Sequence, residues 1–156
     1  MTSAFFYDTP LGRLGIAEVD GAITHVFWGN TAQPADYLVC ETPLLREAAA
    51  QLADYFDGAR RLFDLPLRPE GTAFARAVWA ALMRIPYGET RTYGQLAAAI
   101  GQPKAARAVG RALHVNPISI LIPCHRVIGA GGQLTGYAGG MDAKRFLLVL
   151  EAFFRA

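Results

Sequence analysis

The chain has 156 residues, of which 53% are hydrophobic and 18% charged, a composition that predicts a compact globular protein and excludes a disordered one. No apolar run approaches the roughly 20 residues that span a bilayer, and the first residues lack the basic region and long apolar stretch of a signal peptide. We therefore expect a cytoplasmic, nucleoid-associated protein with no membrane partner.

Charge is distributed unevenly along the chain, although its net value is only +2. Residues 1–71 contain five basic and ten acidic residues, whereas residues 72–156 contain ten and three. The basic second half favours a polyanionic partner. A solvated surface with uneven charge would give the same counts and stays open as an alternative.

The first half of the chain is predicted to begin with β-strands. Residues 14–19 and 23–28 are rich in apolar residues and flank Asp20-Gly21, a dipeptide typical of tight hairpin turns. Residues 5–7 are a candidate third strand. The pattern predicts a small sheet at the N-terminus.

A helix is predicted from Pro43, because apolar residues recur at helical spacing until Gly58, which is a plausible stop. Residues 61–71 contain two prolines and are predicted to form a strand edge followed by a linker. The sign of the charge also changes there. We therefore place a domain boundary between an N-terminal sheet-plus-helix domain of residues 1–71 and a second domain of residues 72–156.

The second half is predicted to be mostly helical. Thr72 is placed to cap a first helix through residues 74–85, which Pro86 and Gly88 end. Two short helices, over residues 93–100 and 104–115, are separated by a tight turn that contains glycine, which is the outline of a helix-turn-helix. A last helix is predicted from about Met141 or Asp142 to Phe154.

The second of the two short helices is slim and basic. Its small residues are Ala105, Ala106, Ala108, Gly110 and Ala112, and its basic residues are Lys104, Arg107 and Arg111. A helix that reads bases in the major groove usually carries long polar side chains, whereas small residues with interspersed arginines would let a helix backbone approach a narrow groove. Tight packing against a neighbouring helix is the alternative that this composition leaves open.

The stretch ILIPCHRVIG, residues 120–129, places polar residues inside an apolar run. Burying His125 and Arg126 without partners would be costly, so we interpret the polar centre as a functional group held on a buried scaffold. A thiolate is a nucleophile, and cationic neighbours lower the pKa of a thiol from about 8.5, so we expect Cys124 to be reactive. Cys40 has no such neighbour and is interpreted as a small structural residue.

Contact between the side chains of Cys124 and His125 requires a backbone that departs from a regular strand. Neighbouring side chains of a regular strand point to opposite faces, so a tight turn or a bridging water would be needed to bring the two into contact. Two cysteines and three histidines give neither a disulfide framework nor recognisable metal-ligand spacing. We expect no metal and no other cofactor.

A set of motifs surrounds this cysteine over residues 71–151. They are IPYGET, TYGQLA, KAARAVG, NPISILI, PCHRVIG, GYAGG and, near the C-terminus, KRFLLVLE. Their order and spacing resemble those of the O-6-alkylguanine-DNA alkyltransferases, also called methylated-DNA–protein-cysteine methyltransferases. The resemblance implies an α/β (α+β) fold, with a small ribonuclease-H-like sheet domain followed by a mainly helical domain that contains the helix-turn-helix. It also implies DNA repair by a single, irreversible transfer of an alkyl (methyl) group from the O-6 position of guanine.

The resemblance assigns catalytic roles to five residues. Cys124 would accept the alkyl group as a thioether. His125 would deprotonate Cys124 through a water, and Glu151 would orient and charge-balance the imidazole, as in other triads of nucleophile, base and orienting group. Asn116 would brace the active-site turn, and Tyr93 would donate a hydrogen bond or a proton to the departing guanine.

The implied partner is double-stranded DNA that contains O-6-alkylguanine, with O-4-alkylthymine left open as a further lesion. The nucleotide would be rotated out of the duplex, because its alkyl carbon cannot be reached inside the stack. Arg107 matches the finger that enters the vacated space. The helix around it, which matches the one in the minor groove, carries Lys104, Ala106, Ala108, Gly110 and Arg111. Arg111 stands where the family usually has a small residue, so it would either contact a phosphate or obstruct the groove.

Three residues are assigned to the substrate pocket, namely Val127, Tyr137 and Ala138. Tyr137 would cover the base, and backbone N–H groups of this segment would meet the guanine oxygen. Ala138 replaces a serine of some relatives but keeps its backbone N–H. We expect a monomer and leave cooperative assembly on DNA open.

Two other functions stay open on the residues alone. A DNA-binding regulator or lesion sensor would use the helix-turn-helix without chemistry and would have no need of Cys124. A cysteine hydrolase is the weaker alternative, because no separate oxyanion loop or distant histidine is visible.

Overall fold

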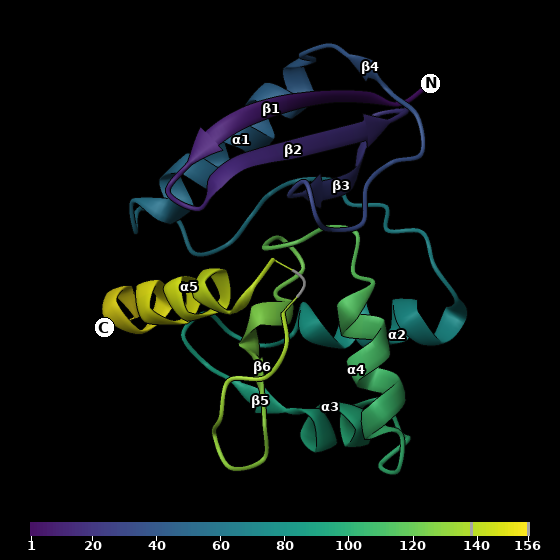
Figure 1. Cartoon of the computed structure of the whole chain (residues 1–156), viewed down its shortest axis with the longest axis vertical. Coiled ribbons are helices and arrows are strands. Elements are labelled where there is room, and N and C mark those ends of the chain that lie inside the picture. The colour runs from purple at the N-terminus through teal and green to yellow at the C-terminus, as the bar shows by residue number, and fades with distance from the viewer. Residues whose placement is uncertain (138, 156) are drawn as a thin grey trace. The chain divides into compact units, whose positions relative to one another are not determined.

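The computed structural model describes residues 1–137 and 139–155 (Figure 1). A small sheet and one helix precede a mainly helical part, which confirms the predicted α/β (α+β) class. Whether residues 1–71 and 72–156 act as separate domains stays a prediction.

Two compact units make up the fold, and they are not simple halves of the sequence. The first unit comprises Met1–Glu70 together with Pro117–Leu121. The second comprises Gly71–Asn116 and the chain from Ile122 onward. A five-residue segment from the second half of the sequence therefore completes the first unit.

The first unit is built on a sheet of short strands. They are β1 (Ser3–Thr9), β2 (Gly12–Val19), β3 (Ala22–Phe27) and β4 (Leu38–Val39). The order in the sheet is β3-β2-β1-β4, with β1, β2 and β3 antiparallel and β4 parallel to β1. Asp20 and Gly21 have φ of 50° and 80°, the left-handed pair that a tight hairpin turn requires. The predicted hairpin is therefore confirmed, and the candidate third strand is confirmed as β1.

Helix α1 (Pro43–Phe56), which the sequence spacing predicted, packs its apolar face against this sheet. Thr42 caps the helix by accepting a hydrogen bond at 3.1 Å from the backbone N–H three residues further on. The strand edge predicted within residues 61–71 is reduced to a single bridge between Leu67 and Ile23. The prolines of this segment lack the N–H that a longer ladder would need.

The segment from the second half of the sequence joins the first unit through Val26. The Val26 N–H donates to the Pro117 carbonyl at 3.0 Å, and the Val26 carbonyl accepts from the Ser119 N–H at 3.1 Å. A γ-turn follows, in which the Leu121 N–H donates to the Ser119 carbonyl at 2.8 Å around Ile120, whose φ is 70°. Positive φ is rare for a β-branched residue and costs about 1–3 kcal/mol, so the surrounding contacts must hold this turn in place.

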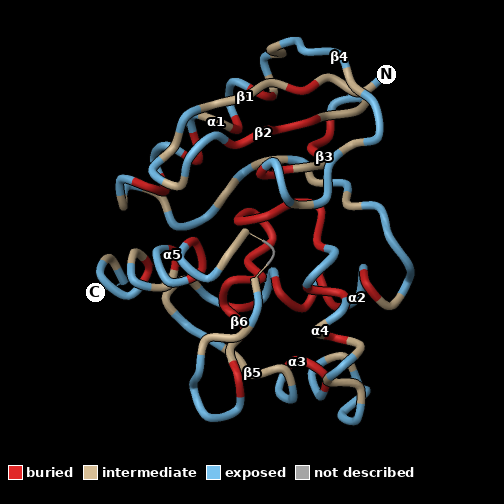
Figure 2. Tube along the Cα trace, viewed as in Figure 1, coloured by how far each residue is buried: buried red, intermediate tan, exposed pale blue. Residues whose placement is uncertain are grey.

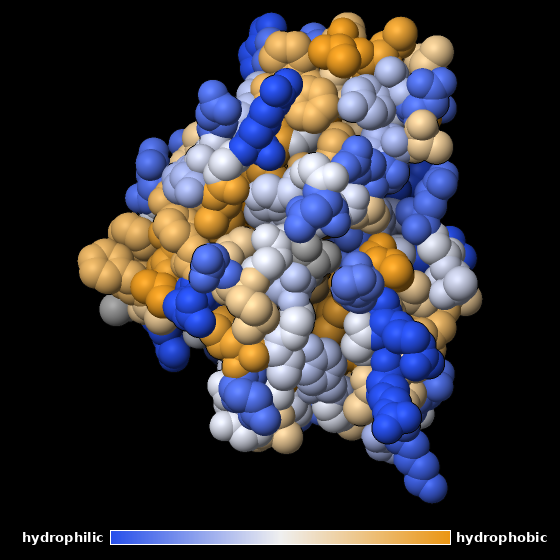
Figure 3. All heavy atoms as spheres, in the orientation of Figure 1, coloured by the Kyte–Doolittle hydropathy of each residue, from blue (hydrophilic) through white to orange (hydrophobic). Residues whose placement is uncertain are grey.

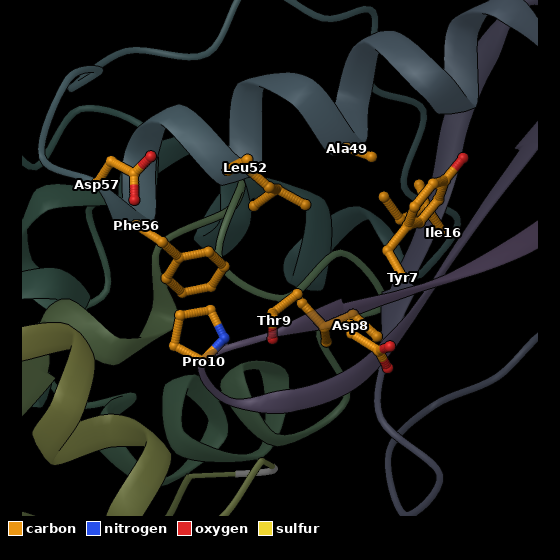
Figure 4. A pocket seen from close by; sticks show the side chains of 11 residues that line it. Tyr7, Asp8, Thr9, Pro10, Ile16, Ala49, Leu52, Phe56 and Asp57 are labelled. Carbon is orange, nitrogen blue, oxygen red and sulfur yellow. The ribbon is translucent and has the colours of Figure 1, made fainter.

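A cavity of about 270 Å³ lies in the first unit, between α1 and the hairpin of β1 and β2 (Figure 4). Phe56 and Pro10 lie at one end of it, and Tyr7 and Ile16 lie at the other (Figure 4). Its lining contains none of the predicted site residues. The candidate chemistry therefore has to be sought in the second unit.

The second unit is mainly helical. Its elements are α2 (Ala73–Leu82), β5 (Arg91–Thr92), α3 (Tyr93–Ala99), α4 (Ala106–His114), β6 (Val127–Ile128) and α5 (Met141–Phe154). α3 and α4 contact each other, and the turn between them passes through Gly101 with φ 77°, which confirms the predicted helix-turn-helix. α2 ends earlier than predicted, with Met83 as its C-cap. β5 and β6 pair in parallel and tie the start of α3 to the stretch after the cysteine.

Residues 116–127 form an unbroken buried run (Figure 2). His125 and Arg126 lie within it, so both need internal partners to offset the loss of water. Within the parts of the chain that the structure describes, no helix has the length and apolar character needed to cross a bilayer.

Candidate active site

Two consecutive tight turns place Cys124. Pro123 has φ −80° and ψ 64°, and the Cys124 N–H donates across it to the Ile122 carbonyl at 2.8 Å, which is an inverse γ-turn. A 3-10 turn over Cys124–Arg126 follows and leads into β6. The stretch is therefore not a regular strand. A tight turn or a bridging water was expected to bring His125 and the sulfur into contact, and the tight turn is present.

Asn116 holds this turn from just beyond the end of α4. Its side-chain amide donates to the Ile122 carbonyl at 3.0 Å and to Cys124 Sγ at 3.3 Å. The residue is only 3% exposed, so these contacts are made away from solvent. A donor aimed at sulfur favours the thiolate over the thiol, so Asn116 acts on the charge of the cysteine as well as on its position.

His125 is fully buried, and its Nε2 lies 2.7 Å from Glu151 Oε2 of α5. Because a carboxylate only accepts hydrogen bonds, Nε2 carries the proton and Nδ1 carries the lone pair of the neutral ring. Nδ1 has no hydrogen-bond partner among the described residues. Burial lowers the pKa of His125 against the opposing effect of Glu151, so the imidazole is neutral at neutral pH. It is a buried base whose Nδ1 is available to accept a proton.

Arg126 completes a buried ion cluster that the sequence analysis did not assign. Its Nε and Nη2 donate to the two oxygens of Glu151 at 2.8 and 3.0 Å, and its Nη1 donates to the Ile85 carbonyl at 2.7 Å. Burial alone would raise the pKa of Glu151, but the hydrogen bonds and charges of His125 and Arg126 lower it well below its usual range. Glu151 is therefore ionised, and the bidentate arginine fixes the carboxylate that contacts the imidazole.

Lys144 is a second buried cation that the sequence analysis missed, with 1% of its surface exposed. Its Nζ donates to the carbonyls of Val127 and Thr135, the latter at 3.1 Å. Helical spacing contained a signal for it, because Lys144, Leu147 and Glu151 share one face of α5 and all three are buried. A lysine near the start of a helix nevertheless looks like an ordinary surface residue.

The predicted lowering of the thiol pKa is wrong for the resting protein. Cys124 is 5% exposed, and burial raises the pKa of its thiol. Asn116, Lys144 and, to a smaller extent, Tyr137 lower that pKa, but burial outweighs them. The sulfur therefore rests as a thiol and must give its proton to a base before it can attack. Cys40, which was interpreted as structural, is exposed.

Tyr93 is the first residue of α3, and a capping box formed by Thr92 and Gln95 fixes the start of that helix. One side of the ring lies beside α4, since a Cβ added at Gly110 would be 3.8 Å from Tyr93 Cε1. The Tyr93 hydroxyl lies 2.5 Å from Thr135 Oγ1. The hydroxyl assigned to the departing guanine therefore has a partner in the resting protein, one that no pattern in the sequence predicted.

The basic residues of the helix-turn-helix are exposed along α4. Figure 3 shows hydrophilic side chains gathered over this helix, at the lower right of the view. The exposed basic residues are Lys104, Arg107 and Arg111, and the partly buried small residues are Ala106, Ala108 and Gly110. Lys104 precedes the helix, which begins two residues later than predicted. On the inner side the Trp79 Nε1–H donates to the Ala112 carbonyl at 2.9 Å, so small residues also serve helix packing here.

The pocket residues are placed in part. Val127 is buried in β6, and its carbonyl accepts from Lys144. Tyr137 is near enough to Cys124 to affect its pKa. Ala138 lies outside the described residues. Among the residues that are described, no group of three or more histidine, cysteine or acidic side chains could hold a metal ion.

Comparison with known protein families matches almost the whole chain. Residues 73–153 match the family model described as 6-O-methylguanine DNA methyltransferase, DNA binding domain, and residues 5–69 match the ribonuclease-like domain of the same proteins. The methylated-DNA–protein-cysteine methyltransferase of Methanosarcina acetivorans is 49% identical over 148 residues, which cover 93% of this chain and 95% of that protein. The constitutive enzyme of that name from Bacillus subtilis is 50% identical over 153 residues, with 92% of each chain covered.

Solved structures give the same result. The crystal structure of Mycobacterium tuberculosis OGT in complex with DNA has a TM-score of 0.92 and 44% identity, and covers 97% of this chain and 94% of that one. The crystal structure of Mycobacterium tuberculosis O6-methylguanine methyltransferase has a TM-score of 0.87 and 44% identity, with 98% and 94% covered. The similarity therefore includes the sheet part of the chain as well as the helical part.

Proposed function

The chain belongs to the 6-O-methylguanine DNA methyltransferase family, and from that membership we propose that it repairs DNA by moving an alkyl group from O-6 of guanine to Cys124. Its activity is that of a methylated-DNA–protein-cysteine methyltransferase, and its partner is double-stranded DNA containing O-6-alkylguanine. The observation that carries the proposal is the buried chain of contacts from Arg126 through Glu151 to His125, one residue from the cysteine.

The reaction begins with the proton of the resting thiol. Nδ1 of His125 accepts it through a bridging water, and the imidazolium so formed is stabilised by the ionised Glu151. The Cys124 thiolate is favoured by the Asn116 amide at 3.3 Å and by the positive charge of Lys144.

Transfer then exchanges one bond for another. The thiolate attacks the alkyl carbon, a carbon–sulfur bond forms, and the bond from that carbon to the guanine oxygen breaks. The electron pair of the broken bond stays on the guanine, where a hydrogen bond or proton from Tyr93 stabilises it. The product on Cys124 is a thioether, which water does not cleave under mild conditions, so each protein molecule reacts once.

DNA engages the exposed basic side of α4. The slim helix enters the minor groove, Tyr137 covers the extruded base, and Arg107 occupies the space that the base leaves. Arg111 lies one turn further along the same side of α4 and contacts a phosphate. We assign residues 72–156 to DNA binding and alkyl acceptance, and residues 1–71 to a supporting domain.

The protein acts as a monomer in the cytoplasm, next to the nucleoid. The direct test of the function is intact-protein mass after incubation with a duplex that contains one O-6-methylguanine. We expect the mass of one methyl group to be added, located on Cys124 by peptide mapping. A protein that binds this duplex tightly and gains no mass would instead be a lesion sensor.

Replacing Arg107 with alanine will weaken binding and repair on a fully paired duplex by about tenfold, the scale of one lost specific contact. The loss will be smaller when the alkylguanine lies opposite an abasic site, because the base is then already unstacked. Binding titrations and single-turnover rates on both duplexes measure the difference. Arg111→Ala is the matched control and should lower affinity equally on the two, as expected for a phosphate contact. Equal losses for Arg107→Ala would contradict the finger role.

The transfer rate will be nearly independent of pH from about 8 down to about 6.5, the usual pKa of histidine. Burial lowers the pKa of His125 and raises that of Cys124, so in this range the base is neutral and the thiol protonated. Transfer of the proton from the thiol to the imidazole takes up no proton from solvent and releases none, so the rate does not change with pH. Rates with free O-6-benzylguanine avoid the pH dependence of DNA binding. A tenfold rise per pH unit would show that pre-ionised thiolate reacts without the base.

A further inference from the structure

Thr135, in the second unit, contacts both Tyr93 and Lys144 and has no role in the reaction proposed above. Its Oγ1 lies 2.5 Å from the Tyr93 hydroxyl, and its backbone carbonyl accepts a hydrogen bond from Lys144 Nζ at 3.1 Å. Lys144 in turn is held by the Val127 carbonyl, three residues beyond the cysteine. The side chain of Thr135 thus contacts Tyr93, while its backbone is linked through Lys144 to Val127 of β6.

The threonine is fixed more firmly than a loop residue usually is. Lys144 is fully buried on α5 and binds two carbonyls, so the backbone at Thr135 has a rigid anchor. Tyr93 is held from its own side by the capping box that fixes the start of α3, and its ring lies beside α4 at Gly110. The two hydroxyls therefore meet between rigid supports, which gives the contact a defined geometry.

A hydroxyl can donate and accept at the same time, and this decides what the contact does. If Thr135 donates to Tyr93, the tyrosine proton is left to point at a guanine in the pocket. Negative charge that develops on the tyrosine oxygen as it donates is then stabilised by the threonine O–H. If Tyr93 instead donates to Thr135, rotation of each hydroxyl about its C–O bond reverses the direction of this hydrogen bond at little cost.

We propose that Thr135 is a positioning residue for alkyl transfer, which orients the Tyr93 hydroxyl and polarises it toward the departing guanine. This inference rests on the proposed function, because it acts through the role of Tyr93. No bond to Thr135 is made or broken. Its proton stays on Oγ1 while the tyrosine hydrogen moves toward the guanine. The backbone anchor on Lys144 keeps the hydroxyl in place when the base enters.

The test is a double-mutant cycle between Thr135→Val and Tyr93→Phe, read as single-turnover transfer from O-6-methylguanine duplex DNA. Valine keeps the branched shape of threonine and replaces the hydroxyl with a methyl group. We expect Thr135→Val to slow transfer about three- to tenfold, the scale of one hydrogen bond, and Thr135→Ser to restore the wild-type rate. In the Tyr93→Phe background the Thr135→Val change should have no further effect, because the group through which it acts is gone. Duplex affinity, measured with Cys124→Ala present, should not change.

Two results would overturn the inference. One is a Thr135→Val protein that transfers at the wild-type rate, and the other is an equal loss with and without the Tyr93 hydroxyl, which would indicate a merely structural role. Melting curves exclude misfolding, and Thr135→Ala provides a second variant without the hydroxyl should valine fail to pack. Wild-type protein that takes up no alkyl group would refute the proposed function itself, whereas normal wild-type transfer with an unaffected Thr135→Val would refute only the role of Thr135.

Discussion

Replacing Cys124 with alanine will give a protein that binds alkylated duplex DNA as the wild type does and takes up no alkyl group. The side chain is 5% exposed, so its removal leaves the DNA-binding surface unchanged. Among the described residues, the Asn116 amide and the charge of Lys144 favour a thiolate at this sulfur, so we expect no other side chain to accept the group. Intact-protein mass with alkylated duplex measures uptake, and fluorescence anisotropy with the same duplex measures binding.

The matched control is Cys40→Ala, which removes the exposed cysteine at the end of the β4 segment. That protein should take up one alkyl group at the wild-type rate. An alkyl group found on Cys40 in the Cys124→Ala protein would refute the assignment of the acceptor.

Replacing Glu151 with glutamine will be the most damaging change to the fold and will also slow transfer. The substitution leaves Arg126 as a buried cation without its counter-charge, and breaking one partner of a buried pair typically costs about 3–5 kcal/mol of unfolding free energy. The imidazole also loses the anion that stabilises its charged form. We expect the folded protein to transfer at least about 100-fold more slowly, the lower range for losing acid–base assistance. Urea unfolding and single-turnover kinetics measure the two effects.

Glu89→Gln is the control for this change, because Glu89 pairs with Arg91 at 3.2 Å with both side chains well exposed. Glu89→Gln should lower the free energy of unfolding by less than about 1 kcal/mol.

The contribution of Glu151 to stability should also depend on pH. Its pKa is lower in the folded protein than the value of about 4.3 in an unfolded chain, so its stabilisation is complete above that pH and is lost as the pH falls toward the folded pKa. The stability gap between wild type and Glu151→Gln should therefore narrow in acid. A gap that widens there would contradict the buried ion pair.

Local patterns in the sequence predicted the elements that local interactions determine. Asp20-Gly21 indicated the hairpin because both residues tolerate positive φ, and Thr72 indicated a helix start because its side chain caps a free N–H group. The family resemblance supplied the class of fold and the reaction. It could do so because the spacing of the motifs around Cys124 is specific.

The remaining features depend on contacts between residues far apart in the chain. Arg126 meets Glu151 across 25 residues, and Tyr93 meets Thr135 across 42, so no local pattern announces either pair. The predicted shift of the Cys124 thiol pKa was wrong for the same reason. Neighbours in sequence indicated positive charge beside Cys124, whereas the depth of burial, which only the folded chain determines, decides the outcome.

The five residues from Pro117 to Leu121 have a consequence for how the protein is made. The Val26 N–H and carbonyl of β3 bond to Pro117 and Ser119, so this part of the β3 edge stays unpaired while the nascent chain ends before this segment. At roughly 5–20 residues per second, a translating ribosome leaves the edge around Val26 open for several seconds after residue 70 has been added, although residues 66–68 already cover the edge at Ile23. During this interval the part of the β3 edge around Val26 is unpaired, and an unpaired strand edge favours association with a wrong partner.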